Sequence, residues 1–155
     1  MFDTIIVPID GSNCAEKAFR LAMTLAKAQN AELRVCSVVD PLDYLGSTPP
    51  SPLAGQQLEA ARGDAERGIA DAVSRAKASG LRAEGQLLLG APPFEIVNYA
   101  SMPGVQAIVM GTHGRSGLSR LMTGSVAESV LRSAPCPVIL LREGVAVPQV
   151  EAAVS

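Results

Sequence analysis

Hydrophobic residues along this chain fall into two patterns, short continuous runs and longer stretches with helical spacing. The runs are rich in Val, Ile and Leu and end at turn-forming residues, which predicts buried strands. The longer stretches repeat an apolar residue every three or four positions, which predicts helices with one buried face. We expect strands at 4–9, 33–39, 83–89, 107–110 and 137–141, and helices at 13–30, 57–79, 94–102 and 125–134.

Strands and helices alternate in this prediction, and their order defines the fold class. It is typical of an α/β fold with a single doubly wound five-stranded parallel sheet, right-handed crossovers and helices on both faces. Ligands of such folds bind outside the carboxyl ends of the strands, where the strand order reverses. In this chain those ends carry Asp10, Asp40 and a glycine-rich loop that starts at Gly111. We therefore expect the functional site there.

The segment 40–55 differs from the rest because it is rich in proline, glycine and serine. We expect no regular structure in it, since proline lacks the backbone N–H that helices and sheets use. A structureless loop of this length is usually functional or mobile. Two interpretations stay open: Leu42 and Tyr44 cover a ligand, or the segment is a flexible solvent loop.

Composition is consistent with one globular domain. The chain has 155 residues, of which 48% are hydrophobic, with only five aromatic residues and no Trp. The core must therefore consist of Val, Ile, Leu and Ala, which suits a parallel sheet covered by helices. We expect one domain over 1–142 and a short mobile tail over 143–155.

The charge, the apolar stretches and the cysteine spacing argue against several classes of protein. Thirteen basic and fifteen acidic residues give a formal charge of −2 without a basic cluster, which argues against a nucleic-acid partner. The N-terminus lacks the pattern of a signal peptide and no apolar stretch is long enough to span a membrane, so we expect a cytoplasmic protein. Three cysteines and one histidine lack metal-ligand spacing, and we expect no metal site.

The stretch 107–125 carries the strongest chemical signal in the sequence. A short apolar strand enters a loop that holds Gly111, Gly114 and Gly117, and Gly124-Ser125 then opens a helix. Glycine permits positive φ and close approach of an anion, and the N-terminus of a helix attracts negative charge. This combination predicts a phosphate cradle, in which the Ser125 hydroxyl either caps the helix or donates to a phosphate oxygen.

The glycine spacing, G-x2-G-x9-G-S, differs from the P-loop and from G-x-G-x-x-G. A glycine-rich turn without a ligand is the alternative interpretation. If the first and fourth strands are neighbours, Asp10 faces the loop across one crevice, and that arrangement fits a nucleotide. For Asp10 and Asp40 the alternative interpretation is a carboxylate that stabilises a turn and binds no ligand, a common role of aspartate.

Six motifs occur in the order of a known family: Pro8-Ile-Asp-Gly-Ser12, Val38-Val-Asp40, Gly90-x-Pro92 with Ile96, Met110-Gly-Thr-His-Gly-Arg-Ser-Gly117, Gly124-Ser-Val126 and Ala134-Pro-Cys-Pro-Val138. Over residues 2–142 the chain resembles the universal stress proteins. The resemblance implies strand order 3-2-1-4-5, membership of the branch that binds ATP, and a homodimer. With that order the last strand, 137–141, lies at an edge and is too apolar to stay unpaired, so we expect it to form the dimer contact.

The resemblance also implies roles for individual residues. Asp10 would hold the ribose or the base edge, the backbone at Val38 would line the adenine, and the glycine motif would hold the phosphates, with Mg²⁺ bound through them. The side chains of His113 and Arg115 are expected to point to solvent, with backbone amides binding the phosphates. The implied ATP contacts are Pro8, Ile9, Asp10, Val38, Met110, Gly111, His113, Gly114, Arg115, Gly124, Ser125 and Val126.

A binding and regulatory protein of the stress response is the function we favour from sequence. The alternatives are a slow ATPase or an autokinase that labels Ser116, Ser119 or Thr123, and a stress protein that binds AMP or cyclic AMP instead. An enzyme is less favoured because no general base and no carboxylate pair can be assigned near the phosphates. A nucleotidyl transferase would need a histidine-rich motif after the first strand, where Asp10-Gly11-Ser12 stands.

Overall fold

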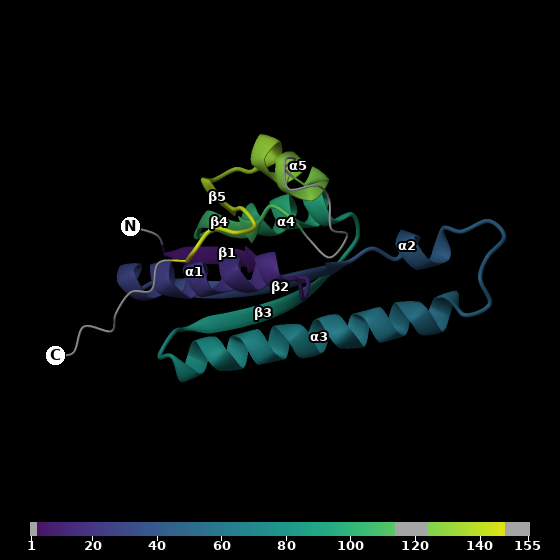
Figure 1. Cartoon of the computed structure of the whole chain (residues 1–155), viewed down its shortest axis with the longest axis horizontal. Coiled ribbons are helices and arrows are strands. Elements are labelled where there is room, and N and C mark those ends of the chain that lie inside the picture. Colours follow the sequence, from purple (N-terminus) through teal and green to yellow (C-terminus); the bar gives the residue numbers. More distant parts are fainter. Residues whose placement is uncertain (1–2, 114–123, 148–155) are drawn as a thin grey trace.

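The computed structural model describes residues 3–113 and 124–147, which form five strands and five helices (Figure 1). The elements alternate along most of the chain, as the hydrophobic pattern predicts. In chain order they are β1 Thr4–Pro8, α1 Asn13–Gln29, β2 Glu32–Val39, α2 Leu42–Leu45, α3 Ala54–Ala78, β3 Ala83–Leu89, α4 Pro92–Ala100, β4 Val105–Gly111, α5 Ser125–Ser133 and β5 Val138–Leu141.

All five strands are parallel, and their order is β3-β2-β1-β4-β5. The predicted fold class and strand order are confirmed. The order reverses between β1 and β4, so the crevice outside their carboxyl ends is the topological switch point. β3 and β5 are the two edges of the sheet.

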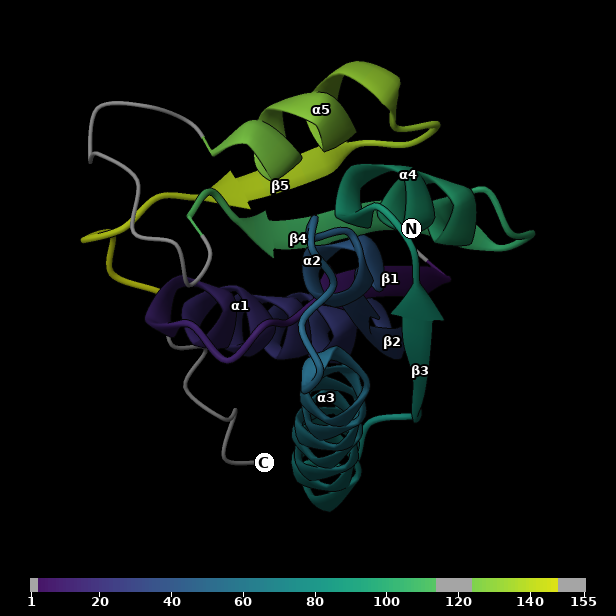
Figure 2. The ribbon, with the colours of Figure 1, turned by 90° about the vertical axis from the view of Figure 1, so that its right-hand side faces the viewer.

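Helices cover both faces of the sheet (Figure 2), with α1 and α3 on one face and α4 and α5 on the other. Two hydrophobic clusters fill these layers, and successive residues of β1 point to opposite clusters: Ile5 and Val7 to the first, Ile6 to the second. Phe19 of α1 is the largest fully buried side chain among the described residues. Aliphatic residues and alanine make up most of the rest, in agreement with the composition.

The α1 helix is capped by Ser12, whose Oγ accepts a hydrogen bond from the Ala15 N–H at 3.1 Å. Glu16 in its first turn binds Arg75 of α3, and the Arg75 guanidinium also lies 5.0 Å from the centroid of the Phe19 ring. These contacts lower the pKa of Glu16, chiefly through the hydrogen bond from Arg75. They join α1 and α3 at the edge of their shared layer.

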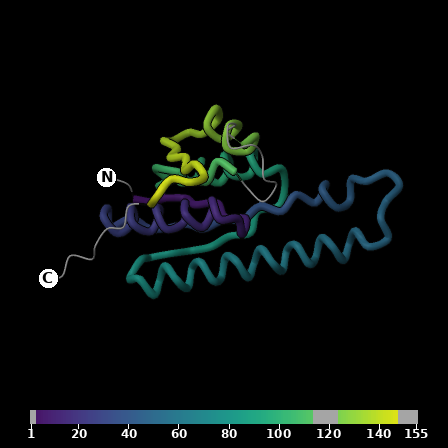
Figure 3. Tube along the Cα trace, viewed as in Figure 1, coloured from purple at the N-terminus to yellow at the C-terminus, as the bar shows by residue number. Residues whose placement is uncertain are grey.

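The expectation that 40–55 lacks regular structure is wrong at both ends. The short helix α2 follows β2 directly, and α3 begins at Ala54, earlier than the predicted position 57. Asp40 starts α2, since its Oδ1 accepts a hydrogen bond from the Leu42 N–H at 2.9 Å. The tube in Figure 3 shows α2 and the first half of α3 extending side by side beyond the end of the sheet.

Candidate functional site

A cavity of about 370 Å³ lies at the carboxyl ends of the strands, between β1 and β4. It is large enough for a small ligand. The structure brings ten of the predicted contacts together in its wall: Pro8, Ile9, Asp10, Val38, Met110, Gly111, His113, Gly124, Ser125 and Val126. Gly114 and Arg115, and the candidate phosphorylation sites Ser116, Ser119 and Thr123, lie outside the described residues.

The longer helices that start at this cavity, α1, α4 and α5, differ in the hydrogen-bond donors they present. Ala15, the residue of α1 in the cavity wall, donates its N–H to Ser12 Oγ, and α4 starts with Pro92 and Pro93, which have no N–H. α5 has no side-chain cap, and the N–H groups of Ser125, Val126 and Ala127 donate no hydrogen bond within the described residues. Free amides at a helix N-terminus attract an anion. Of the three, α5 therefore makes the anion-binding end of the cavity.

Gly111 and Gly124 are both required by packing. A Cβ at Gly111 would lie 2.8 Å from Cys14 Sγ, and one at Gly124 would overlap the carbonyl oxygen of Thr112. The backbone of Gly124 has φ −58°, which any residue can adopt. The sequence argument that the loop glycines supply positive φ therefore does not apply to Gly124. It is needed because α5 begins in direct contact with the chain leaving β4.

Ser125 is the first residue of α5, and Gly124 is its N-cap. Of the two roles predicted for the Ser125 hydroxyl, the capping role is wrong. The side chain is exposed at the cavity wall. A hydroxyl there remains available to a ligand held by the α5 amides.

The expectation that His113 points to solvent is wrong. Its side chain is only 9% exposed, and its Nδ1 lies 3.0 Å from Oγ1 of the buried Thr112. Thr112 is itself held by two backbone hydrogen bonds, from its N–H to Leu141 O and from the Gly124 N–H to its carbonyl. The imidazole therefore lies against the cavity wall on the side where α5 begins.

Asp10 and Asp40 both stabilise turns, but only Asp10 lines the cavity. The Asp10 Oδ1 accepts a hydrogen bond from the Ser12 N–H at 2.9 Å, which matches the turn formed by Asp40 and Leu42. The alternative interpretation is therefore confirmed for Asp40. For Asp10 the turn and a ligand contact are compatible, because one oxygen of its carboxylate accepts the turn hydrogen bond and the other remains.

The backbone of Val38 is exposed to the cavity because β1 ends beside it. Groups along a strand point alternately to its two neighbours: the Cys36 carbonyl accepts from Ile9 N at 2.8 Å on the β1 side, and the Val39 carbonyl accepts from Gly90 N at 3.0 Å on the β3 side. Val38 therefore faces the β1 side. Within the described residues its N–H and C=O have no hydrogen-bond partner.

The cavity wall contains residues that were not predicted as contacts: Ser12, Ala15, Asp43, Pro92, Ile96, Thr112 and Ala127. Pro92 and Ile96 stand in a motif that carried the family resemblance, so a sequence signal for them existed. Asp43 had no such signal, because it reaches the wall through the short helix α2, which the sequence did not predict. Leu42 and Tyr44, predicted as possible ligand covers, are not in the wall, and Leu42 is 73% exposed.

A doubly wound parallel sheet with a cavity at its switch point, one end of it formed by uncapped helix amides, defines the class of Rossmann-like α/β proteins. The model of the universal stress protein family matches residues 1–142. The chain belongs to that family. No helix within 3–113 and 124–147 has the length and apolar character to cross a membrane.

Relatives in sequence and structure agree with this assignment. Universal stress protein YxiE of Bacillus subtilis is 34% identical, over 92% of this chain and all of its own length. The structure of universal stress protein UspA from Lactobacillus plantarum matches with a TM-score of 0.79 and 28% identity, covering 91% of this chain and 98% of its own. A universal stress protein in complex with cAMP matches with a TM-score of 0.64 and 27% identity, covering 91% and 97%.

Proposed function

We propose that this protein binds an adenine nucleoside 5′-phosphate, with ATP as the ligand, and acts as a binding and regulatory protein of the stress response. One observation carries the proposal: a single cavity has free helix amides at one end and the unpaired peptide edge of Val38 at the other. The amides of Ser125, Val126 and Ala127 suit phosphate oxygens. Mg²⁺ would be held through the phosphates, as is usual for that ion.

The Val38 edge suits adenine in particular. Its N–H would donate to N1 of the base, and its C=O would accept from the N6 amine. Guanine presents the opposite pattern, with a donor at N1 and an acceptor at O6, so both hydrogen bonds would be lost. A site that hydrogen-bonds its substrate rejects such analogues strongly. The apolar side chains of Ile9 and Ile96 in the same wall would contact the faces of the ring.

Asp10 follows β1, which lies between β2 with Val38 and β4 with the nearby start of α5. It would therefore accept a hydrogen bond from a ribose hydroxyl, between the base and the phosphates. The related stress protein in complex with cAMP supports an adenine nucleotide as the class of ligand. Gly114 and Arg115 keep their proposed role as phosphate contacts.

The test is a calorimetric titration of ATP into the wild type and a Ser125→Glu variant. Glutamate in the first turn of a helix is favourable to the helix itself, so α5 should stay folded while the added charge repels phosphate. We expect micromolar ATP binding by the wild type and at least a tenfold loss in the variant. Ser129→Glu, an exposed position of the same helix outside the cavity wall, is the matched control.

GTP in the same titration tests the base. We expect GTP to bind at least a hundredfold more weakly than ATP, because both hydrogen bonds to Val38 would be replaced by unfavourable contacts. Equal binding of ATP by the two serine variants would contradict the phosphate site, and equal binding of ATP and GTP would contradict the adenine edge. A wild type that binds neither would contradict the proposed function as a whole.

We propose further that the protein is a homodimer through β5. This strand is an edge of the sheet, and its residues Val138, Ile139 and Leu140 are only partly covered. An apolar edge strand with free backbone groups is a template for pairing with another copy. Pairing the two copies of β5 would bury these side chains around a two-fold axis.

A further inference from the structure

The cavity wall contains two carboxylates, Asp10 and Asp43, and no lysine or arginine among its described residues. Asp43 accepts no hydrogen bond and forms no ion pair within the described part of the chain. Its charge therefore acts on whatever occupies the cavity, moderated by solvent because the residue is exposed.

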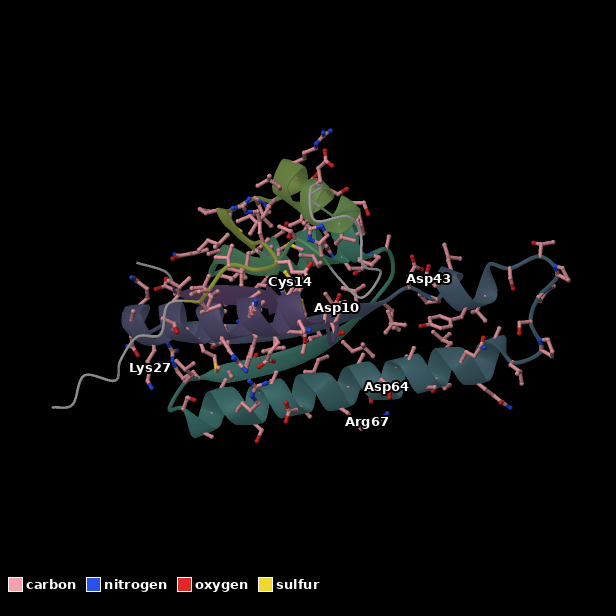
Figure 4. All side chains as sticks on the ribbon, in the orientation of Figure 1. Asp10, Cys14, Lys27, Asp43, Asp64 and Arg67 are labelled. Atoms are coloured by element: carbon pink, nitrogen blue, oxygen red, sulfur yellow. The ribbon has the colours of Figure 1, made fainter. Side chains whose placement is uncertain are left out.

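Asp43 is held in place by the turn that starts α2. The Asp40 carboxylate binds the Leu42 N–H at 2.9 Å, and the Asp40 carbonyl accepts from the Asp43 N–H at 3.1 Å. Since α2 follows β2, Asp43 lies on the side of the cavity that carries Val38, and Asp10 follows the neighbouring strand β1. Figure 4 shows Asp10 near the middle of the molecule and Asp43 farther along, on α2.

Charge is therefore distributed unevenly around the cavity. The free amides of α5 lie on the β4 side, whereas both carboxylates lie on the β1–β2 side. A phosphate is favoured at the first side and repelled at the second. Both carboxylates stand in the wall of this one cavity of about 370 Å³, so a nucleotide bound in it would lie close to them.

We infer that Asp43, acting with Asp10, is a specificity-determining residue that selects nucleotides phosphorylated on the ribose 5′ oxygen over those phosphorylated on the 3′ oxygen. This inference rests on the proposed function. A 5′-phosphate extends from the ribose toward α5 and away from the two carboxylates. A 3′-phosphate is attached to the ring on the side that they face, and in cyclic AMP the phosphate is bonded to both oxygens and cannot move away.

The matched ligands are adenosine 5′-monophosphate and adenosine 3′-monophosphate, which have the same composition and charge and differ only in the position of the phosphate. Each is titrated against protein loaded with ATP, so that displacement of ATP reports its affinity. Asp43→Asn removes the charge and keeps the shape of the side chain. Asp3→Asn is the control, because Asp3 precedes β1 and therefore lies at the amino ends of the strands, opposite the end that carries the cavity.

We expect the wild type and Asp3→Asn to prefer the 5′-phosphate, and Asp43→Asn to lose about threefold to tenfold of that preference by gaining affinity for the 3′ isomer. Cyclic AMP should gain affinity in the same variant. Raising the salt concentration should reduce the preference of the wild type and leave that of Asp43→Asn less affected.

An unchanged ratio of the two affinities in Asp43→Asn, with ATP bound normally, would overturn the inference and leave the proposed function intact. A ratio that changes equally in Asp3→Asn would overturn it as well, because only the total charge would then matter. Failure of the wild type to bind ATP would remove the proposed function and this inference together.

Discussion

The Gly124 N–H donates to the carbonyl oxygen of Thr112 at 2.9 Å, and this contact leaves no space for a side chain at Gly124. The Thr112 N–H in turn donates to Leu141 O at 3.0 Å. Thr112 therefore connects the end of β4 to the end of β5 and to the start of α5. The position of the first α5 amides at the cavity depends on this connection.

Replacing Gly124 by alanine should destabilise the protein and weaken nucleotide binding together. The new methyl group would overlap Thr112 O, and α5 would have to move away from β4. We expect the free energy of unfolding to fall by about 1–3 kcal/mol, as for other substitutions that overfill a packed site. Urea unfolding and an ATP titration measure the two effects. A variant as stable as the wild type would show that the helix adjusts without cost.

Replacing Gly68 by alanine should have the opposite effect and serves as its control. Gly68 is an exposed residue inside α3, and a Cβ there would meet nothing within 4 Å. Alanine favours the helix and restricts the unfolded chain, so the free energy of unfolding should rise by about 0.5–1 kcal/mol. Urea unfolding is again the measurement, and ATP affinity should not change. A loss of stability would contradict a regular, open helical position at Gly68.

The ion pair between Glu16 and Arg75 should make stability depend on pH in the acid range. Arg75 lowers the pKa of Glu16, first by hydrogen bonding and then by its charge, so folding favours the ionised carboxylate. The contribution is present above the ordinary pKa of 4.5 and is lost as the pH falls through the lowered value. Because both side chains are more than a third exposed, we expect the ion pair to contribute no more than about 1 kcal/mol to the free energy of unfolding.

Glu16→Gln tests this prediction. In urea unfolding the variant should be less stable than the wild type at pH 7, and the difference should diminish as the pH falls below the ordinary glutamate pKa of 4.5. Glu59→Gln is the comparison, because within 3–113 and 124–147 the one ion pair of Glu59 is an exposed contact with Arg62 of the same helix. A difference that does not vary with pH would mean that Glu16 contributes through packing alone.

Replacing Ile139 by lysine should yield monomers or aggregates if β5 pairs with a second copy. The edge strand would then carry a charge that opposes pairing. Sedimentation velocity measures the oligomeric state, and far-UV circular dichroism checks the fold, since Ile139 also packs against the core. Lysine at Leu89 in the other edge strand, where the side chain is exposed, is the control. An unchanged sedimentation profile of a folded Ile139→Lys protein would count against the dimer.

The sequence by itself determined the fold class, the order of the elements and the end of the sheet that carries the site. These follow from local patterns: apolar runs and helical spacing specify strands and helices, and Gly, Pro and Asp specify where they end. The motif beginning at Gly111 and the position of Asp10 could likewise be assigned, because both immediately follow predicted strands. The segment 40–55 was predicted wrongly at its two ends, where α2 forms and α3 begins, and at the first of these the hydrogen bonds of Asp40 start a helix despite the nearby prolines.

Only the tertiary structure decided which of these residues face one another. The close approach of Gly124 to Thr112, the burial of His113 and the free backbone of Val38 depend on where one element ends beside another, and spacing along the chain does not specify that. The inclusion of Asp43 in the cavity wall has the same origin, since the direction of α2 follows from its packing against α3. Local patterns determine elements, whereas contacts between distant segments determine the site.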